Sequence, residues 1–310
     1  MFPGERIDPF TRDSLKGAIE LLSQQIINGI TIGAIYALIA LGYTMVYGIL
    51  KIVNFAHGDI FMMGTFFGLF ILKYFNAPFF LAFILSALFT ALLGMVVERL
   101  AYRPLRFTDR IVPLISAMGV SIFLVNLAQL VWGTETHPFP KVFPIKTYTF
   151  NGMTISSIQI LILVLSVILM IGLHLFVTKT RIGTAMRATS MSITNAKLMG
   201  INTNFIIAIT FAVGSALAAA AGILVGIYYD AVYPTMGYTA GLKAFTAAVL
   251  GGIGNIPGAM AGGLLLGITE NLGAAYISSQ YRDAIAFIIL IVVLMVKPTG
   301  IFGKKEINKV

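Results

Sequence analysis

Long apolar stretches, separated by shorter polar ones, occupy most of this chain. An apolar segment of about 20 residues has the length of a helix that crosses a membrane. The pattern predicts such helices at about residues 22–49, 60–76, 79–98, 111–132, 156–177, 205–229, 242–253, 256–277 and 283–297. The sequence therefore predicts an all-α polytopic membrane protein with about 8–9 transmembrane helices.

Two of these segments, 242–253 and 256–277, are joined by Gly-Gly-Ile-Gly-Asn-Ile-Pro-Gly at 251–258. Glycine and proline at this density break a helix. The first segment is also too short to cross a bilayer by itself. We therefore expect a broken or re-entrant pair here. Whether the pair makes two crossings or a single hairpin stays open at this point.

The composition agrees with a chain that lies mostly in lipid. Its 310 residues are 58% hydrophobic and 11% charged, with a mean hydropathy of +0.93. A soluble domain carries about 25% charged residues, so this chain cannot present a polar surface on all sides. We divide it into a polar N-terminal segment at 1–20, a transmembrane domain at 21–300 and a cytosolic tail at 301–310.

Lysine and arginine are shared unequally between the two ends of the predicted helices. One side collects thirteen of them: Lys51, Arg99, Arg103, Arg106, Arg110, Lys179, Arg181, Arg187, Lys197, Lys297, Lys304, Lys305 and Lys309. The other side collects five: Lys73, Lys141, Lys146, Lys243 and Arg282. Cytoplasmic loops are enriched in these residues, so the thirteen mark the cytoplasmic side. The same bias explains the net charge of +9 without a nucleic-acid partner.

This assignment places the loops 99–110 and 178–204 and the C-terminus in the cytoplasm, and the loop 133–155 outside. An odd number of crossings would place the N-terminus outside, and one broken helix would reverse that.

The loop 178–204 is basic, rich in small residues and longer than the connections usual in a helix bundle. Its segment 195–201 places Ala196 and Gly200 four residues apart, on one face of a helix that could lie close against a partner. It resembles the cytosolic coupling loop of ABC-transporter permeases, in which Glu-Ala-Ala is followed after three residues by Gly. We expect Arg187, Asn195, Ala196 and Gly200 to contact an ATPase; the alternative is an ordinary cytosolic connection.

Four polar side chains fall within nine residues between the first two apolar segments, among them Asn54, His57 and Asp59. Such groups are costly at membrane depth unless they face water or one another. One interpretation is a short cytosolic turn in which Asp59 caps a helix beginning at Ile60. The other is a broken helix that lines a translocation pathway or its inner gate.

Glu270 lies within an apolar, glycine-rich segment. A carboxylate inside the membrane is a functional candidate by default. We assign it a gating or structural role, in which it either lines the pathway or pairs within the bundle.

Motifs that carry catalysis are absent from the sequence. There is no G-x-x-x-x-G-K-[ST] phosphate loop, no H-E-x-x-H and no cysteine. We therefore expect no catalytic residue, no metal site and no cofactor bound by this chain. If ATP drives the protein, it must be hydrolysed by a separate polypeptide.

Four blocks of sequence carry a closer resemblance: Ala40–Asp59, Glu98–Arg106, Lys197–Thr203 and Lys243–Ala259. Together they closely resemble the LivH-type permease subunit of branched-chain amino acid ABC importers, over roughly 22–305. The family pattern in the coupling loop is loose, and here Thr194 and Asn195 replace its first two residues.

The resemblance implies a multi-pass subunit of the bacterial inner membrane that moves leucine, isoleucine or valine by alternating access. It implies a homologous second permease (LivM-like), two cytosolic ATPase subunits (LivG/LivF-like), an external substrate-binding protein and the surrounding lipid as partners. Relatives carry other amino acids, amides or urea, so a related substrate remains an alternative. A stand-alone carrier driven by an ion gradient, with Glu270 or Asp59 as its coupling carboxylate, is the other.

Overall fold

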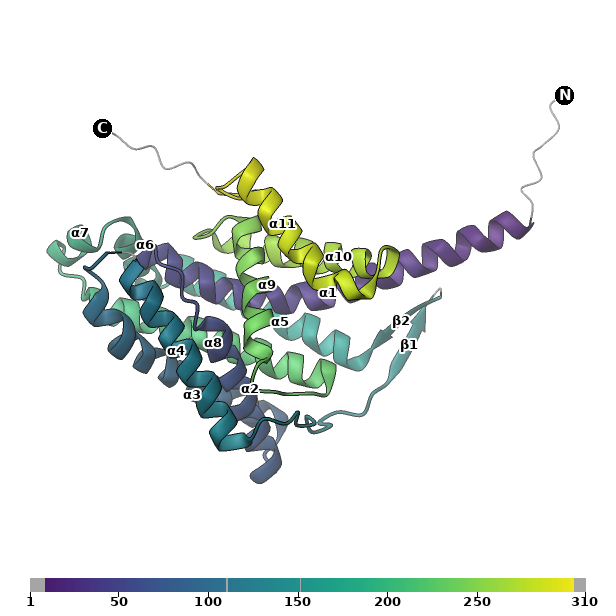
Figure 1. Cartoon of the computed structure of the whole chain (residues 1–310), viewed down its shortest axis with the longest axis horizontal. Helices are drawn as coiled ribbons and strands as arrows, with labels where there is room; N and C mark the ends of the chain where they lie inside the picture. The colour runs from purple at the N-terminus through teal and green to yellow at the C-terminus, as the bar shows by residue number, and fades with distance from the viewer. Residues whose placement is uncertain (1–8, 110, 151, 304–310) are drawn as a thin grey trace.

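The computed structural model describes residues 9–109, 111–150 and 152–303. The predicted N-terminal segment 1–20 and tail 301–310 therefore lie partly outside the described residues. The α-helices are α1 (Pro9–Leu50), α2 (His57–Tyr74), α3 (Phe79–Val97), α4 (Ile111–Trp132), α5 (Ser157–Lys179), α6 (Arg181–Met191), α7 (Ile193–Leu198), α8 (Thr203–Tyr229), α9 (Met236–Gly251), α10 (Ile256–Tyr276) and α11 (Arg282–Val296) (Figure 1). Shorter elements are the π-helical turn η1 (Glu98–Tyr102) and the 3-10 turns η2 (Arg103–Leu105) and η3 (Ser279–Tyr281).

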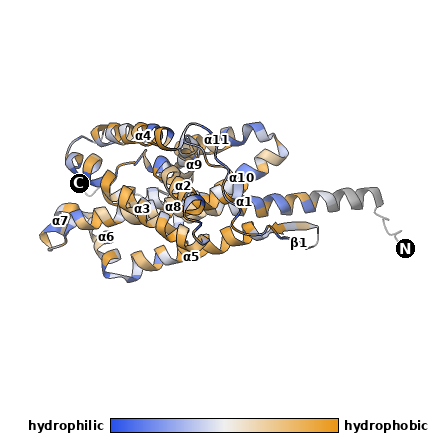
Figure 2. Ribbon diagram, turned by 90° about the horizontal axis from the view of Figure 1, so that it is seen from below, coloured by the Kyte–Doolittle hydropathy of each residue, from blue (hydrophilic) through white to orange (hydrophobic). Residues whose placement is uncertain are grey.

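Within the described part of the chain, six helices are long and apolar enough to cross a membrane. They correspond to the candidate spans 19–50, 79–105, 111–132, 157–179, 203–229 and 279–296. Apolar residues cover most of the length of α3 and α5, whereas α7 mixes apolar and hydrophilic residues (Figure 2). The chain is thus a helical, multi-pass membrane protein.

The helices divide into a central and a peripheral set. The most apolar windows of α1 and α8 are 78% and 72% buried inside the protein, whereas that of α11 is only 6% buried. The buried core is formed chiefly by α1, α2, α8 and α9. The faces of α3, α4, α5 and α11 that the core leaves exposed are apolar, as is expected of surfaces in contact with lipid or with another subunit.

Helix α1 is longer than the sequence pattern predicts. It begins by residue 9 instead of 22 and has 42 residues, a length of about 63 Å. That is about twice the hydrocarbon thickness of a bilayer. Its N-terminal part projects beyond the bundle (Figure 1).

The loop predicted at 133–155 contains a β-hairpin, formed by β1 (Thr147–Phe150) and β2 (Met153–Ser156) with Thr147 opposite Ser156. Gln24 of α1 holds this hairpin, because its Oε1 accepts a hydrogen bond from the Thr154 amide (2.8 Å) and its Nε2 donates one to the Thr154 carbonyl (2.9 Å). The hairpin therefore lies against the projecting part of α1.

Glycines set the distance between the central helices α1 and α10. A Cβ at Gly33 would meet the backbone of Leu264, and one at Gly267 would meet the backbone of Gly33. Small residues of this kind let membrane helices approach at backbone distance. The glycine-rich segments of the sequence therefore mark a close helix contact of the bundle.

The broken pair is α9 and α10, which are joined by 252–255. Helix α9 begins at Met236, six residues before the predicted start, and has 16 residues. At about 1.5 Å per residue it remains shorter than a bilayer is thick. Gly252 and Gly254 adopt positive φ angles (102° and 93°) at the break, which a side chain would strain.

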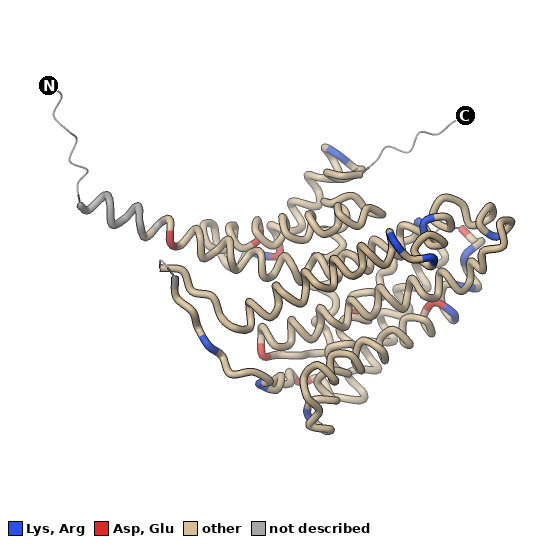
Figure 3. Tube along the Cα trace, turned by 180° about the vertical axis from the view of Figure 1, so that it is seen from behind, with Lys and Arg blue, Asp and Glu red and all other residues tan. Residues whose placement is uncertain are grey.

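Basic residues gather at the end of the molecule that carries α6 and α7, away from the N-terminus (Figure 3). The described residues at this end include Arg103, Arg106, Lys179, Arg181 and Lys197. This distribution is the one that cytoplasmic ends of membrane helices show.

Candidate functional site

The segment that links α1 to α2 is buried and held by Asn54, which is 2% exposed. The Asn54 Oδ1 atom accepts hydrogen bonds from the Tyr102 hydroxyl (2.8 Å) and the Ala56 amide (3.1 Å). The Asn54 carbonyl accepts a third from the His57 amide (3.1 Å). Asn54 therefore shapes the turn before α2 and ties it to η1.

His57, the first residue of α2, is 1% exposed. Its ring lies edge-on to Tyr43, with ring centroids 4.7 Å apart, and fills the space that a side chain at Gly42 would occupy. Among the described residues, its Nε2 atom has no hydrogen-bond partner. His57 thus lies deep in the contact between α1 and α2, and not in a cytosolic turn.

Asp59 does not cap α2 as one interpretation of the sequence expected. The helix begins at His57 instead of Ile60, and its N-cap residue is Ala56, whose side chain makes no capping bond. The sequence suggested a cap because Asp is a common one, but the Asn54 turn already starts the helix. Asp59 is instead a buried residue of the first turn, 3% exposed.

The Asp59 carboxylate lies beside the first turns of two helices, its own α2 and α9. A Cβ placed at Gly237, the second residue of α9, would come within 2.9 Å of Asp59 Oδ1. The N-cap residue of α9, Thr235, makes no side-chain capping bond either. Helix N-termini attract negative charge, so these two first turns stabilise a carboxylate with which no described Lys or Arg forms an ion pair.

The N-terminal ends of α2 and α9 meet at backbone contact. A Cβ at either Gly58 or Gly237 would collide with the carbonyl of the other. We call the contact formed by Asn54, His57, Gly58, Asp59 and Gly237 the helix-start junction. It brings together three of the polar residues that the sequence singled out.

Glu270 belongs to a second, separate cluster. It is 1% exposed, and its Oε1 accepts hydrogen bonds from Lys243 Nζ (2.9 Å) and the Tyr36 hydroxyl (3.3 Å). Arg282 Nε lies 3.6 Å from the same oxygen, and Lys243 Nζ also lies 2.6 Å from Asp283 Oδ1. These five residues form the Glu270 cluster, which joins α1, α9, α10 and α11.

The sequence pattern places Lys243 among the five basic residues on the outer side of the membrane. The structure places it inside the bundle instead. It is 7% exposed, lies within α9 and pairs with Glu270. Both residues are single charges of opposite sign in apolar segments, and that pattern could have indicated the pair. Tyr36 and Asp283 carry no such mark in the sequence.

The loop 178–204 folds into α6 and α7. Thr180 caps α6 by accepting a hydrogen bond from the Gly183 amide, and Ser192 caps α7 by accepting one from the Asn195 amide. A Cβ at Gly183 would meet the carbonyls of Phe176 and Val177. The first turn of α6 therefore lies close against the end of α5.

Ala196 and Gly200 do not form one exposed helical face. Ala196 is 4% exposed and turns into the protein. Gly200 lies beyond the end of α7 with φ +81°, and a side chain there would meet no other atom. The sequence pattern failed because the helix ends at Leu198, before Gly200. Arg187 and Asn195 are exposed, and whether they contact a partner stays a prediction.

Large apolar side chains at the ends of α6 and α7 stand out into solvent. Met191, Leu198 and Met199 are 88%, 81% and 82% exposed, and we call them the α6–α7 patch. Such exposed apolar side chains can contribute to a protein-docking site where they form a contiguous surface.

An ion pair connects this region to η1. Arg106 pairs with Glu98 of η1, and its Nη1 donates a hydrogen bond to Asn204 Oδ1 at the start of α8 (2.8 Å). Burial lowers the pKa of Arg106 to about 10, so the guanidinium stays charged at neutral pH. Glu98 and Tyr102 thus link the end of the α6–α7 loop to Asn54 through one π-helical turn.

A cavity of about 520 Å³ lies between the ends of α1, α5 and α6, the break between α9 and α10, and the segment after α11. We call it the inner cavity. Its lining residues are Thr44, Met45, Gly48, Ile49, Lys51, His174, Val177, Thr178, Met186, Arg187, Ser190, Ile253, Gly254, Asn255, Ile256, Pro257, Phe302 and Gly303. It therefore combines cations with apolar walls.

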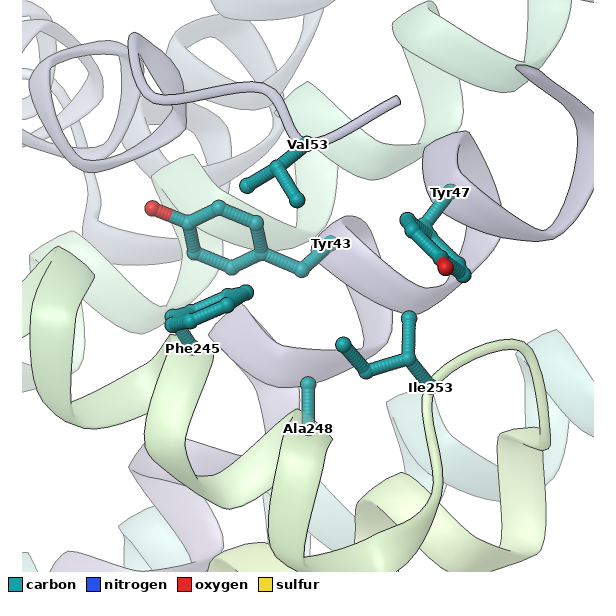
Figure 4. Close-up of a pocket in the computed structure, with 6 residues that line it drawn as sticks. All are labelled: Tyr43, Tyr47, Val53, Phe245, Ala248 and Ile253. Atoms are coloured by element: carbon teal, nitrogen blue, oxygen red, sulfur yellow. The ribbon is translucent and has the colours of Figure 1, made fainter. Parts of the chain in front are cut away.

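A closed constriction adjoins the inner cavity, and Ile253 lines both. Figure 4 shows Tyr43 and Tyr47 of α1 with Val53 on one side, and Phe245 and Ala248 of α9 on the other. The space between them holds no room for a water molecule. The constriction thus lies next to the helix-start junction, where Tyr43 contacts His57, and next to the inner cavity, with which it shares Ile253.

Residues 25–294 match the sequence profile of a protein family. That family is described as the permease component of the branched-chain amino acid transport system. The chain is 47% identical over 299 residues to the high-affinity branched-chain amino acid transport system permease protein BraD of Pseudomonas aeruginosa, covering 93% of this chain and 97% of BraD. It is 44% identical, with the same coverage, to the corresponding LivH of Escherichia coli. The solved structure of PsaBC from Streptococcus pneumoniae covers 93% of this chain and 95% of its own, with a TM-score of 0.45 and 12% identity.

The helical fold and these matches define a membrane transport subunit of the permease class, and not a catalytic enzyme. The chain belongs to the family of branched-chain amino acid transport permeases.

Proposed function

We propose that this chain is the membrane-spanning permease subunit of an ATP-binding cassette importer for leucine, isoleucine and valine in a bacterial inner membrane. The observation that carries the proposal is the family match, which spans nearly the whole membrane domain, at 25–294. The gathering of basic residues around α6 and α7 supports a cytoplasmic position for that end. On this orientation α1, α2, α3, α4, α5, α8, α9, α10 and α11 supply nine crossings, and this odd number places the N-terminus outside.

The proposed complex contains a LivM-like second permease, two LivG/LivF-like ATPase subunits and an external binding protein. ATP is bound and hydrolysed by the ATPase subunits, and this chain binds no cofactor. The exposed apolar faces of the peripheral helices leave room for the second permease and lipid. Arg187, Asn195 and the α6–α7 patch are the proposed contacts with an ATPase.

Alternating access requires that the driving ligand bind two states differently. We propose the helix-start junction and the adjoining constriction as the gate, with Asn54, His57 and Asp59 at its centre. The inner cavity on its cytosolic side is open while the constriction is closed. Glu270 pairs with Lys243 in the middle of α9, so it acts on the gate through the helix that carries Gly237 and Phe245.

A carrier driven by an ion gradient receives less support from this geometry. Its coupling carboxylate would have to gain and lose a proton or cation during transport. Glu270 already pairs with Lys243 and Arg282, and Asp59 lies against two helix starts. Glu270 could exchange a proton or cation only by giving up these ion pairs.

Exchange of the external binding protein tests the substrate. A branched-chain amino acid is a zwitterion with an apolar tail, so its passage needs a few polar groups against mostly apolar walls. We expect labelled leucine to enter proteoliposomes only with a leucine-binding protein present. Replacing that protein by an amide-specific relative should abolish leucine uptake. Undiminished uptake would place selectivity in the permease.

Tyr102→Phe tests the link between the ATPase side and the gate. The substitution removes only the hydroxyl that donates to Asn54, a loss of about 1 kcal/mol in stability. We expect ATP hydrolysis to persist while leucine uptake per ATP falls several-fold. Tyr74→Phe is the matched control, because Tyr74 is 66% exposed at the far end of α2. If leucine uptake per ATP were the same in both variants, η1 would not be part of the gate.

A further inference from the structure

The segment after α11 turns back and covers the end of α9. Its residues 297–303, which we call the C-terminal strap, come directly after α11. The Ile301 amide donates a hydrogen bond to the Leu250 carbonyl (2.8 Å), and the Phe302 amide donates one to the Gly251 carbonyl (3.1 Å). A helix leaves the carbonyls of its last turn without partners in the helix itself. The strap therefore completes the C-terminal end of α9.

The strap is a tight turn that requires glycine at one position. The Gly300 amide donates a hydrogen bond to the Lys297 carbonyl (2.8 Å), and Lys297 Nζ donates one to the Ile301 carbonyl (2.9 Å). Gly300 has a φ angle of +76°, and a Cβ there would meet the Val249 carbonyl and the backbone of Gly252. The strap and the end of α9 thus approach at backbone distance, and a side chain at position 300 would push them apart.

Asn255 joins the strap to the break between α9 and α10. Its Nδ2 atom donates a hydrogen bond to the Phe302 carbonyl (2.9 Å). Its Oδ1 atom accepts one from the Gly258 amide (3.2 Å) and so caps the N-terminal end of α10. An aspartate caps a helix equally well, but it has no donor for the strap. The two bonds that the Asn255 amide makes can therefore be separated by mutation.

The segments held in this way form one wall of the closed constriction. Ile253 of the break and Ala248 near the end of α9 both line it (Figure 4). Phe302 of the strap and Asn255 line the adjoining inner cavity. The strap continues from α11, which packs against both α9 and α10, so it holds the end of α9 and the break in one position.

We propose that the C-terminal strap keeps the constriction closed, and that Asn255 is the positioning residue through which the strap holds Ile253 in place. The inference rests on the proposed function only in taking the constriction as the gate. Asn255 acts by fixing the break, not by contact with a substrate. Release of the strap frees the end of α9, and the wall that it carries then separates from Tyr43 and Tyr47 of α1.

Thiol labelling of the purified full-length chain tests the strap. The natural chain has no cysteine, so Ala248→Cys places a single thiol in the wall of the constriction. Ala248 is 0% exposed, so this thiol should react slowly with a small uncharged reagent. Asn255→Asp keeps the cap of α10 and removes the bond to the strap. We expect it to raise the labelling rate about tenfold, because the loss of one hydrogen bond shifts an opening equilibrium by this order.

Ala117→Cys is the matched reporter of general loosening. Ala117 is also 0% exposed, but it lies on α4, which supplies no residue to the described lining of the constriction or the inner cavity. Its labelling should stay slow when Asn255→Asp is added. A protein that merely unfolds more readily would expose both thiols.

Gly300→Ala releases the strap by a second route, since the added methyl group would collide with the end of α9. We expect it to raise labelling of Ala248→Cys to a similar extent. Gly133→Ala is the control for backbone strain. Gly133 also has a positive φ angle (+90°), but no described atom lies within 4 Å of an added Cβ, so this change should leave the labelling rate as it was.

Unchanged labelling of Ala248→Cys in both strap variants would overturn the proposal, and so would an equal rise at Ala117→Cys. Such a failure is distinct from failure of the proposed function. The labelling uses neither ATP nor leucine, whereas ATP-driven leucine uptake by the wild-type complex tests the function separately.

Discussion

Lys243→Met is expected to destabilise the protein by about 3 kcal/mol or more, because it leaves the carboxylate of Glu270 buried without its nearest cation. Glu270 is 1% exposed, and Arg282, its remaining cation, lies at 3.6 Å and is partly exposed. The change should lower the thermal unfolding temperature in detergent and reduce the yield of folded protein. Uptake should fall with it, because α9 also carries part of the gate.

The double variant Lys243→Met with Glu270→Leu separates charge from shape. Removing both charges replaces a buried pair by apolar groups, which is often neutral. We expect the double variant to recover most of the lost stability. Asp283→Asn is the control, since the Asp283 side chain is 57% exposed and an exposed ion pair contributes at most about 1 kcal/mol. A double variant as unstable as Lys243→Met would show that the cluster is held by packing and not by charge.

Leu198→Asp combined with Met199→Asp is expected to abolish assembly with the ATPase subunits while the permease stays folded. The two side chains are more than 80% exposed, so the fold does not depend on them. Central apolar residues of an interface each contribute about 2 kcal/mol or more, and two together account for a loss of at least about a hundredfold in affinity. Co-purification and stimulated ATP hydrolysis measure the effect.

The apolar exchange Leu198→Met with Met199→Leu is the matched control and should assemble normally. Gly200, the residue favoured by the sequence pattern, is a poor choice for the same experiment. Any side chain there would strain its backbone at φ +81° and confuse folding with docking. Normal assembly of the double aspartate variant would exclude the α6–α7 patch as the docking surface.

The sequence predicts the helices well where polar residues interrupt apolar ones. Helices α4 and α10 begin at the expected residues, 111 and 256, and at α10 the glycine- and proline-rich break marks the start. The start of α9 was missed, since Gly237 looks like a loop residue until it packs against Gly58 of α2. The projecting part of α1 was missed because its composition is polar.

The candidate residues can be found in the sequence because polar groups are costly to bury in a membrane. Which of them pair with one another cannot be found in this way. Asn54, His57 and Asp59 are close in sequence, so a local pattern was enough to group them. Glu270 and Lys243 are 27 residues apart and meet only because α9 and α10 fold back on one another. The coupling residues Ala196 and Gly200 depended on where one short helix ends, which sequence patterns locate poorly.

The central claim is that this chain transports branched-chain amino acids only when a separate ATPase drives it. The direct test is uptake of labelled leucine into proteoliposomes that hold the chain with its second permease, ATPase subunits and binding protein. We predict uptake that requires ATP and disappears when the ATPase is omitted, whatever the pH gradient. Leucine uptake by this chain alone, driven by a pH gradient without ATP, would contradict the account.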